Sequence, residues 1–136
     1  MHVLLTEAKF GDCDALSKPL RDNGCRVSRC HAREGICLAL APGSSCPLDD
    51  RADPPVLAVD VRDADPELTA REFGVVCALR KQVPVAIVPP EPGLPVAAPA
   101  GLEDRVTVTD AETLLSTCRA AASIPRPRPE PAGAIG

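Results

Sequence analysis

Short aliphatic runs recur along the chain and are separated by segments with helical spacing. The three clearest runs are His2–Thr6, Val56–Asp60 and Val83–Val88. Their nearly continuous apolar character over so few residues is typical of strands buried on both faces of a sheet. Cys25–Cys30 alternates apolar with basic residues, which indicates a strand at a sheet edge, and Arg105–Val108 predicts a last short strand.

Three other segments carry apolar residues at spacings of three and four, the period of an amphipathic helix. The first begins near Cys13 and stops at Asn23–Gly24, because glycine suits the position just past a helix end. The second is predicted to start at Asp65–Glu67, which offers an N-cap acid, a proline at the first helical position and a further acid. The third opens at Thr109–Glu112, whose spacing is that of a capping box. The apolar positions of the three helices are Leu16 and Leu20; Leu68, Val75, Val76 and Leu79; and Ala111, Leu114, Leu115 and Cys118.

Strands that alternate with helices in this way predict an α/β fold. We expect a three-layer sandwich with a mainly parallel, about five-stranded flavodoxin-like sheet, because each strand–helix–strand unit makes its two strands parallel. A single domain over residues 1–122 would hold these elements, with an irregular or hairpin insertion at 31–55 and a proline-rich loop at 89–103. Residues 123–136 include the run PRPRPEP, and we expect this proline-rich tail to be disordered.

Composition and charge narrow the classes of protein that fit this fold. The chain has 136 residues and is 45% hydrophobic, but it has two phenylalanines, no tryptophan and no tyrosine. A net charge of −4 and the shortage of aromatic rings for base stacking argue against a nucleic-acid partner. No apolar run is long enough to span a membrane, and the first residues lack the basic region of a signal peptide. We therefore expect a cytoplasmic protein with no membrane partner.

The remaining partner classes are a protein and a small-molecule ligand. No glycine-rich loop stands between a strand and a helix, as phosphate binding requires, and we expect no cofactor. In open parallel sheets, ligands bind beyond the carboxyl ends of the strands. This rule selects six candidate ligand-binding residues at that edge: Thr6, Glu7, Lys9, Arg62, Asp63 and Thr69.

Asp60 closes the third strand at the same edge, and we expect Glu7 of the first strand to lie next to it. The stretches MHVLLTE, PVLAVDV and LRKQVPVAIV, together with a first helix ending in NG, resemble the receiver domain of response regulators over most of residues 3–120. The resemblance places Asp60 in the phospho-acceptor position and implies a flavodoxin-like fold.

The chain departs from the receiver pattern at the positions that carry the phosphoryl chemistry. Ala8 follows Glu7 where a receiver has a second acid to hold Mg²⁺. Pro89 and Thr109 stand where a receiver has a serine or threonine and a lysine. The leading hypothesis is therefore a degenerate receiver-like domain that acts as a non-catalytic regulatory or partner-binding module.

A second resemblance is local and supports an enzyme as the alternative. Ala64–Val88 is similar to the segment of nucleoside deoxyribosyltransferase-like proteins that carries their nucleophilic glutamate, and Glu72, Gly74, Ala78, Lys81 and Val83–Val85 match it in order. The resemblance implies that Glu72 attacks an anomeric carbon, with Asp60 or Asp65 positioning the sugar, so that an N-glycosidic bond is cleaved. The tyrosine that this family has near its N-terminus is missing from the chain. The structural alternative is that Glu72 is a solvated acid within the helix and Gly74 allows close packing of helix on sheet.

Seven cysteines and a histidine supply a third hypothesis, a cysteine-based redox or metal sensor. The metal candidates are Cys30, His31, Cys37 and Cys46, with Cys25 and Cys77 as further members of the set. Their spacings match no close C-x2-C pair, and buried free thiols in an aromatic-poor core are the interpretation that we favour. Cys37 and Cys46 could also pair as a disulfide across the turn between them. Cys25 and Cys30 are an odd number of residues apart, so we expect them on opposite faces of the sheet.

Overall fold

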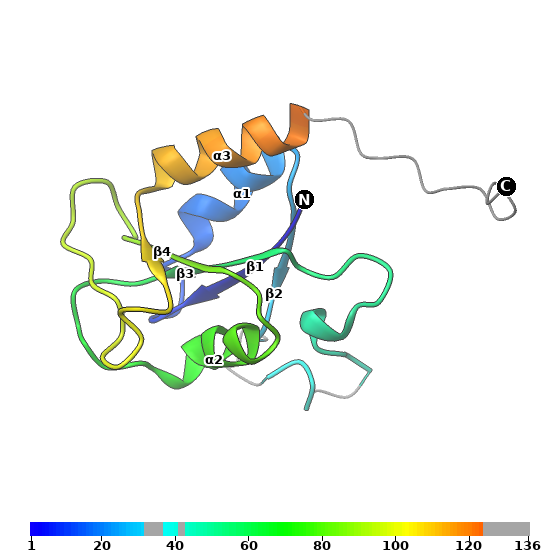
Figure 1. Cartoon of the computed structure of the whole chain (residues 1–136), viewed down its shortest axis with the longest axis horizontal. Coiled ribbons are helices and arrows are strands. Elements are labelled where there is room, and N and C mark those ends of the chain that lie inside the picture. The colour runs from blue at the N-terminus through cyan, green and yellow to red at the C-terminus, as the bar shows by residue number, and fades with distance from the viewer. Residues whose placement is uncertain (32–36, 41–42, 124–136) are drawn as a thin grey trace, which may run out of the picture.

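The five strands of the chain form one parallel sheet that lies between two helical layers (Figure 1). This computed structural model describes residues 1–31, 37–40 and 43–123. The strands are β1 (His2–Glu7), β2 (Arg26–Arg29), β3 (Leu57–Val61), β4 (Val85–Val88) and β5 (Thr107–Val108). The α-helices are α1 (Asp14–Asp22), α2 (Phe73–Arg80) and α3 (Ala111–Ser123), and two 3-10 helices are η1 (Pro47–Asp49) and η2 (Ala70–Glu72).

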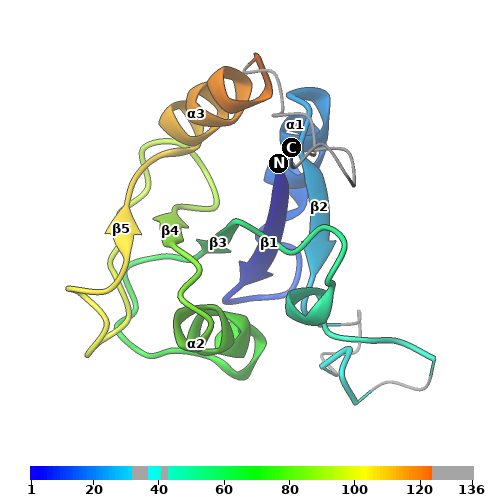
Figure 2. The same cartoon turned by 45° about the vertical axis from the view of Figure 1, so that its right-hand side comes forward.

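The strand order is β2-β1-β3-β4-β5, and every neighbouring pair is parallel. Figure 2 shows α1 and α3 on one side of the sheet and α2 on the other. This arrangement confirms the predicted three-layer α/β sandwich with a five-stranded flavodoxin-like sheet. The edge position of β2 is confirmed as well, since this strand pairs with β1 alone among the strands of the sheet.

Successive side chains along the central strands point to opposite faces of the sheet, so the core has two halves. Val3, Leu5, Val59 and Val61 pack with α1 and α3, whereas Leu4, Ala58 and Ile87 pack with α2. The register pairs Thr6 with Asp60 across β1 and β3, so both side chains continue the row that faces α2. The core is built from aliphatic residues and thiols because both phenylalanines lie outside it, each with 57% of its surface exposed.

The predicted start of the second helix at Asp65–Glu67 is wrong, and the reason lies in three carbonyl groups. The Arg62 guanidinium donates hydrogen bonds to the carbonyls of Asp65 and Glu67, each at 2.8 Å. The Pro66 carbonyl accepts from the Ala100 amide, also at 2.8 Å. Because carbonyls bonded in this way cannot accept from the next helical turn, residues 62–69 form a loop and η2 begins only at Ala70.

The capping residue of α3 also differs from the prediction, because Asp110 takes this role instead of Thr109. The Thr109 amide donates to the Ile87 carbonyl at 2.8 Å, which ties this residue to the sheet. Asp110 caps the helix instead, because its Oδ1 accepts from the Thr113 amide at 2.7 Å. The predicted inner face of this helix is confirmed, with Leu114 and Cys118 buried against α1 and the sheet.

Among the described residues of the predicted insertion at 31–55, His31 and Cys37 form an antiparallel bridge. The helix η1 in the same region was not predicted. The loop over 89–103 has neither helix nor strand, as its prolines indicate. The predicted disordered tail lies outside the described residues from position 124 onward. Among the helices that the structure describes, none is long and apolar enough to cross a bilayer.

Candidate functional site

Three ionisable side chains meet beneath the carboxyl edge of the sheet, and each of them is fully buried. Asp60 comes from β3, Arg62 follows the end of that strand, and Glu72 comes from η2; all three have 0% of their surface exposed. We refer to these three residues as the buried charge cluster. The structure thus brings Asp60 and Glu72 together, and a solvated position for Glu72 is wrong.

The Asp60 carboxyl group has Thr6 and Glu72 as its polar neighbours. The Thr6 hydroxyl donates to its Oδ1 at 2.8 Å, which follows from the register of β1 and β3. Burial, and next to it the hydrogen-bonded and negatively charged Glu72 carboxylate, raise the pKa of Asp60 to about 9. Asp60 is therefore protonated at neutral pH.

The guanidinium of Arg62 gives the cluster its positive charge. Its Nε lies 3.3 Å from Glu72 Oε2, while Nη2 holds the two loop carbonyls described above. With Asp60 protonated, the positive charge of Arg62 and the negative charge of Glu72 leave the cluster without net charge, which is the state that burial favours. Among the described residues, Arg62 Nη1 has no hydrogen-bond acceptor in reach.

Glu72 reaches the cluster because a capping box fixes its backbone. The Thr69 amide donates to Glu72 Oε1 at 2.9 Å, and the Thr69 side chain takes part in the reciprocal bond to the Glu72 backbone. The Thr69 hydroxyl also donates to the Ala8 carbonyl at 2.9 Å. Thr69, a predicted ligand-binding residue, therefore anchors the start of η2 to the loop after β1.

Gly74 lets α2 settle on top of Thr6 and close the cluster from outside. A Cβ atom at this position would lie 2.8 Å from Thr6 Cγ2 and 3.0 Å from Cys30 Sγ. Side chains larger than hydrogen do not fit such distances without displacing a neighbour. The prediction that Gly74 allows close packing of helix on sheet is confirmed.

Glu7 does not join Asp60, contrary to the expected acidic pair. Its register partner is Val61, so its side chain points to the α1 side of the sheet while that of Asp60 points to the α2 side. The Glu7 carboxylate accepts from the Gly11 amide at 3.0 Å and from the Cys13 amide at 3.3 Å. It therefore organises the loop between β1 and α1.

The side chains of Glu7, Cys13 and Asp14 offer ligand atoms that all lie within 4.8 Å of one another. Their partners do not suit a metal ion. Burial and the Glu7 carboxylate raise the pKa of the Cys13 thiol to about 12, so the neutral thiol donates to Glu7 at 3.2 Å. Asp14 is paired with Arg29 at 2.9 Å. Because thiolate is the form that binds metal, we assign this trio to loop structure.

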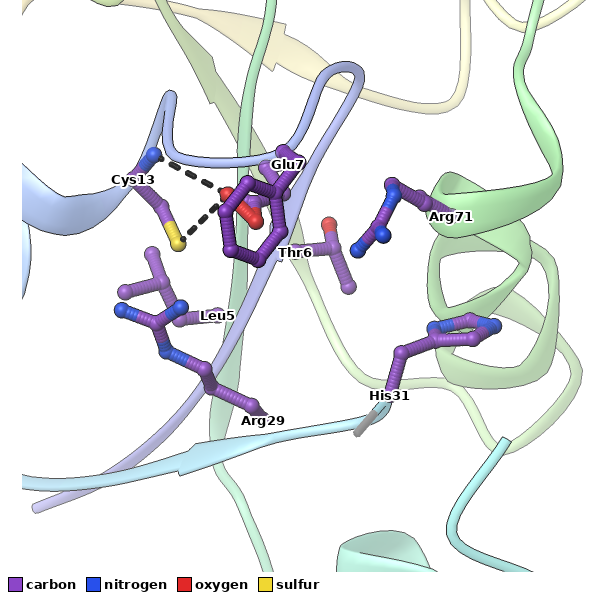
Figure 3. A pocket seen from close by; sticks show the side chains of 8 residues that line it. Leu5, Thr6, Glu7, Cys13, Arg29, His31 and Arg71 are labelled. Atoms are coloured by element: carbon purple, nitrogen blue, oxygen red, sulfur yellow. Dashed lines mark hydrogen bonds between the residues drawn. The ribbon is translucent and has the colours of Figure 1, made fainter. Parts of the chain in front are cut away.

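A small pocket of about 50 Å³ opens between the ends of β1 and β2 (Figure 3). Thr6, Glu7 and Cys13 line its inner side, and Arg29, His31 and Arg71 surround them. Its volume suits a few water molecules. Sequence reasoning selected Thr6 and Glu7 for this edge but missed Arg29, although Arg29 closes a strand and the same rule would have found it.

Two other predicted ligand-binding residues, Lys9 and Asp63, lie on the outer surface of the edge, whereas Arg62 does not. Lys9 and Asp63 form a solvent-accessible ion pair at 3.2 Å. The Asp65 carboxylate accepts from the Glu67 amide at 2.9 Å and stays exposed, so the structure does not bring it to Glu72. Arg62 is buried in the cluster and cannot contact a ligand from solvent.

A groove of about 280 Å³ runs between α1, α3 and the loop after β4. It is lined by apolar side chains such as Leu16, Pro90 and Leu115, with Asp12 and Asp110 at its border. None of the six predicted ligand-binding residues lines it. The proline-rich loop was predicted, but its contribution to a groove depends on how α1 and α3 are spaced.

The predicted cysteine set divides between the two faces of the sheet. Cys25 belongs to the core half beneath α1 and α3, and Cys30 belongs to the half beneath α2, which confirms their opposite orientation.

A scan against protein-family models finds no match for the chain, and a search of the curated proteins finds no relative at a significant level.

Proposed function

We propose that this protein is a non-catalytic α/β module, similar in architecture to a receiver domain, that acts in regulation by binding a protein partner. The observation that carries this proposal is the burial of the charge cluster. The acid at the position of a receiver's phospho-acceptor, Asp60, has 0% of its surface exposed. Its outer side is covered by Thr6, Glu72 and the close approach of Gly74.

A buried and protonated carboxyl group is unsuited to attack phosphorus. The attacking species must be a carboxylate, and the pKa of about 9 keeps Asp60 protonated at neutral pH. A Mg²⁺ ion would need several oxygen ligands at one point. Glu7 points to the other face of the sheet and is already bonded to the loop before α1, so it does not complete such a set.

The edge above the cluster has the composition of a binding surface. Phe10 follows β1 and Phe73 starts α2, and these two exposed rings are the only phenylalanine, tyrosine or tryptophan side chains of the chain. The Arg71 guanidinium lies 5.1 Å from the centre of the Phe10 ring. Aromatic residues and arginine are enriched where proteins bind one another, which favours a protein as the partner.

The test is phosphoryl transfer from acetyl phosphate in the presence of Mg²⁺, read by the intact mass of the protein. We expect no added phosphoryl group on the native chain. Asp60→Asn is the control that shows which site reacts if mass is gained. A phosphoryl group found on the wild-type protein and absent from Asp60→Asn would overturn the proposal.

Cleavage of an N-glycosidic bond is the second candidate, and the contact between Asp60 and Glu72 is the observation that favours it. A protonated acid beside a carboxylate is the pair that such a reaction uses. Burial of both groups argues against it, because no nucleoside reaches them without opening of the 62–72 segment. Release of free base from nucleosides by the wild-type protein but not by Glu72→Gln would establish this function in place of the proposed one.

A further inference from the structure

The groove between α1, α3 and the loop after β4 lies at the carboxyl edge of the sheet. Its lining includes Asp12 after β1, Val61 at the end of β3 and Pro89 just after β4. The chain moves outward from β1 to β2 and outward from β3 to β4 and β5, so the order of the strands reverses between β1 and β3. Ligands of open parallel sheets bind at such a point, beyond the carboxyl ends of the strands. The groove therefore occupies the place where this fold offers a ligand site.

The spacing of α1 and α3 explains why the groove is open. Both helices cover the same face of the sheet (Figure 2). Their C-terminal ends are joined, because Arg119 Nε donates to Asn23 Oδ1 at 2.9 Å. At their N-terminal ends, small side chains such as Ala15 and Ala111 line the space between them. Methyl groups do not fill this space, and the groove of about 280 Å³ remains.

The volume and the apolar lining suit a small molecule. Leu16 of α1, Leu115 of α3 and Pro90 of the loop contribute apolar surface to the groove. An apolar cavity of about 150 Å³ is large enough to bind benzene, and small-molecule pockets start at about 300 Å³. A groove of about 280 Å³ therefore accommodates an apolar body about the size of two fused rings.

The charged residues of the groove all have the same sign. Asp12, Asp110 and Glu112 line it, and no lysine, arginine or histidine is among its described lining residues. Burial raises the pKa of the Asp12 carboxyl group, since its charged form is partly removed from water. A positive charge in the groove would be attracted by all three carboxylates, and a negative charge would be repelled by them.

Neither a metal ion nor an anion fits this arrangement. Among the residues that the structure describes, the acids that share a potential metal position are Glu7 and Asp14, with Cys13, and they do not line the groove. The N-terminus of α3 could attract an anion through its backbone amides. However, Asp110 already occupies this end of the helix, because its Oδ1 accepts from the Thr113 amide at 2.7 Å. The three carboxylates around an apolar space therefore favour an organic cation.

We propose that the groove binds a small organic cation, whose ammonium group lies among Asp12, Asp110 and Glu112 and whose apolar body packs against Leu16 and Leu115. Binding is non-covalent, and the ligand keeps its proton. The groove lies on the face of the sheet opposite to the buried charge cluster, since Val61 belongs to the core half beneath α1 and α3. The proposal is independent of the protein partner proposed above.

The test is a titration of tryptamine with the full chain, read by the fluorescence of the indole ring. The chain has no tryptophan and no tyrosine, so the signal comes from the probe alone. Tryptophol, which has a hydroxyl group in place of the ammonium group, and indoleacetate, which is an anion, are the matched probes. We expect one tryptamine per chain. Tryptophol should bind at least about 10-fold more weakly and indoleacetate more weakly still, because the charge attracted by three carboxylates is lost or reversed.

Two variants locate the site, and a third is their control. Asp12→Asn should weaken tryptamine binding by about 5-fold, the upper range for a partly exposed ion pair. Ala15→Leu fills the groove with a larger side chain and should weaken binding by about 10-fold or more. Asp22→Asn, which removes an acid at the other end of α1, should bind as the wild type does. Circular dichroism of each variant confirms that the fold is intact.

Absence of saturable tryptamine binding by the wild type would overturn the proposal. Equal affinities for tryptamine and tryptophol would overturn the selection of a cation. Unchanged tryptamine binding by both Asp12→Asn and folded Ala15→Leu would show that the probe binds elsewhere, and would overturn the assignment of the groove.

Discussion

Replacing Asp60 by asparagine removes a proton from the buried charge cluster while keeping its shape. The carbonyl of the introduced amide can accept from the Thr6 hydroxyl in place of Asp60 Oδ1, and its NH₂ group can donate toward Glu72 Oε2. The cluster remains without net charge, because Arg62 and Glu72 balance each other. The change therefore isolates the cost of keeping residue 60 protonated.

The magnitude follows from the difference in pKa between the two states of the chain. The pKa of Asp60 is raised from 3.8 to about 9 on folding. A group with a raised folded pKa stabilises the protein fully below the unfolded value and loses that contribution as the pH rises toward the folded value. The free energy of unfolding should thus fall by up to about 1.4 kcal/mol per pH unit between about pH 5 and pH 8.

The assay is urea denaturation at several pH values from about pH 4 to pH 8. Asp60→Asn should match the wild type most closely near pH 4 and be the more stable protein near pH 8 by several kcal/mol, a gap that widens with pH at about the slope above. Asp63→Asn is the matched control, since this solvent-accessible acid lies three residues away and its loss should leave the pH slope unchanged. Parallel pH profiles for wild type and Asp60→Asn would refute the protonated state of Asp60.

Two further substitutions test how the cluster is closed. Arg62→Met should lower the free energy of unfolding by about 3–5 kcal/mol, because it leaves the buried Glu72 without its partner and frees the Asp65 and Glu67 carbonyls. A loss below about 1 kcal/mol in urea denaturation would show that the pair of Arg62 and Glu72 does not hold the fold. Gly74→Ala should cost about 1–3 kcal/mol, since its methyl group would collide with Thr6; an unchanged denaturation midpoint would contradict the close approach of α2.

The sheet could be predicted because burial on both faces leaves a simple pattern in the sequence. His2–Glu7, Leu57–Val61 and Val85–Val88 are aliphatic enough to be recognised without knowing their neighbours. Their parallel order then follows from the connecting helices. Local signals were weaker where a distant partner competes, as at Asp65–Glu67, where side-chain and loop contacts occupy the carbonyls that a helix would need.

The site could be predicted only in part. Asp60 and Glu72 were both selected from the sequence, but their burial together depends on the loop of residues 62–69 and on the capping box at Thr69. The expected pairing of Glu7 with Asp60 ignored the alternation of side chains along β1, since the partner of Asp60 across that strand is Thr6.

The most direct test of the central claim is carboxyl labelling of the native protein with a water-soluble carbodiimide and an amine, mapped by peptide mass spectrometry. We expect Asp63 and Asp65 to be labelled, because both carboxylates are open to solvent at the same edge. Asp60 and Glu72 should stay unlabelled until the chain is unfolded, because both are fully buried. Labelling of Asp60 or Glu72 in the folded protein would show that solvent and substrates reach the cluster, and would contradict a non-catalytic function.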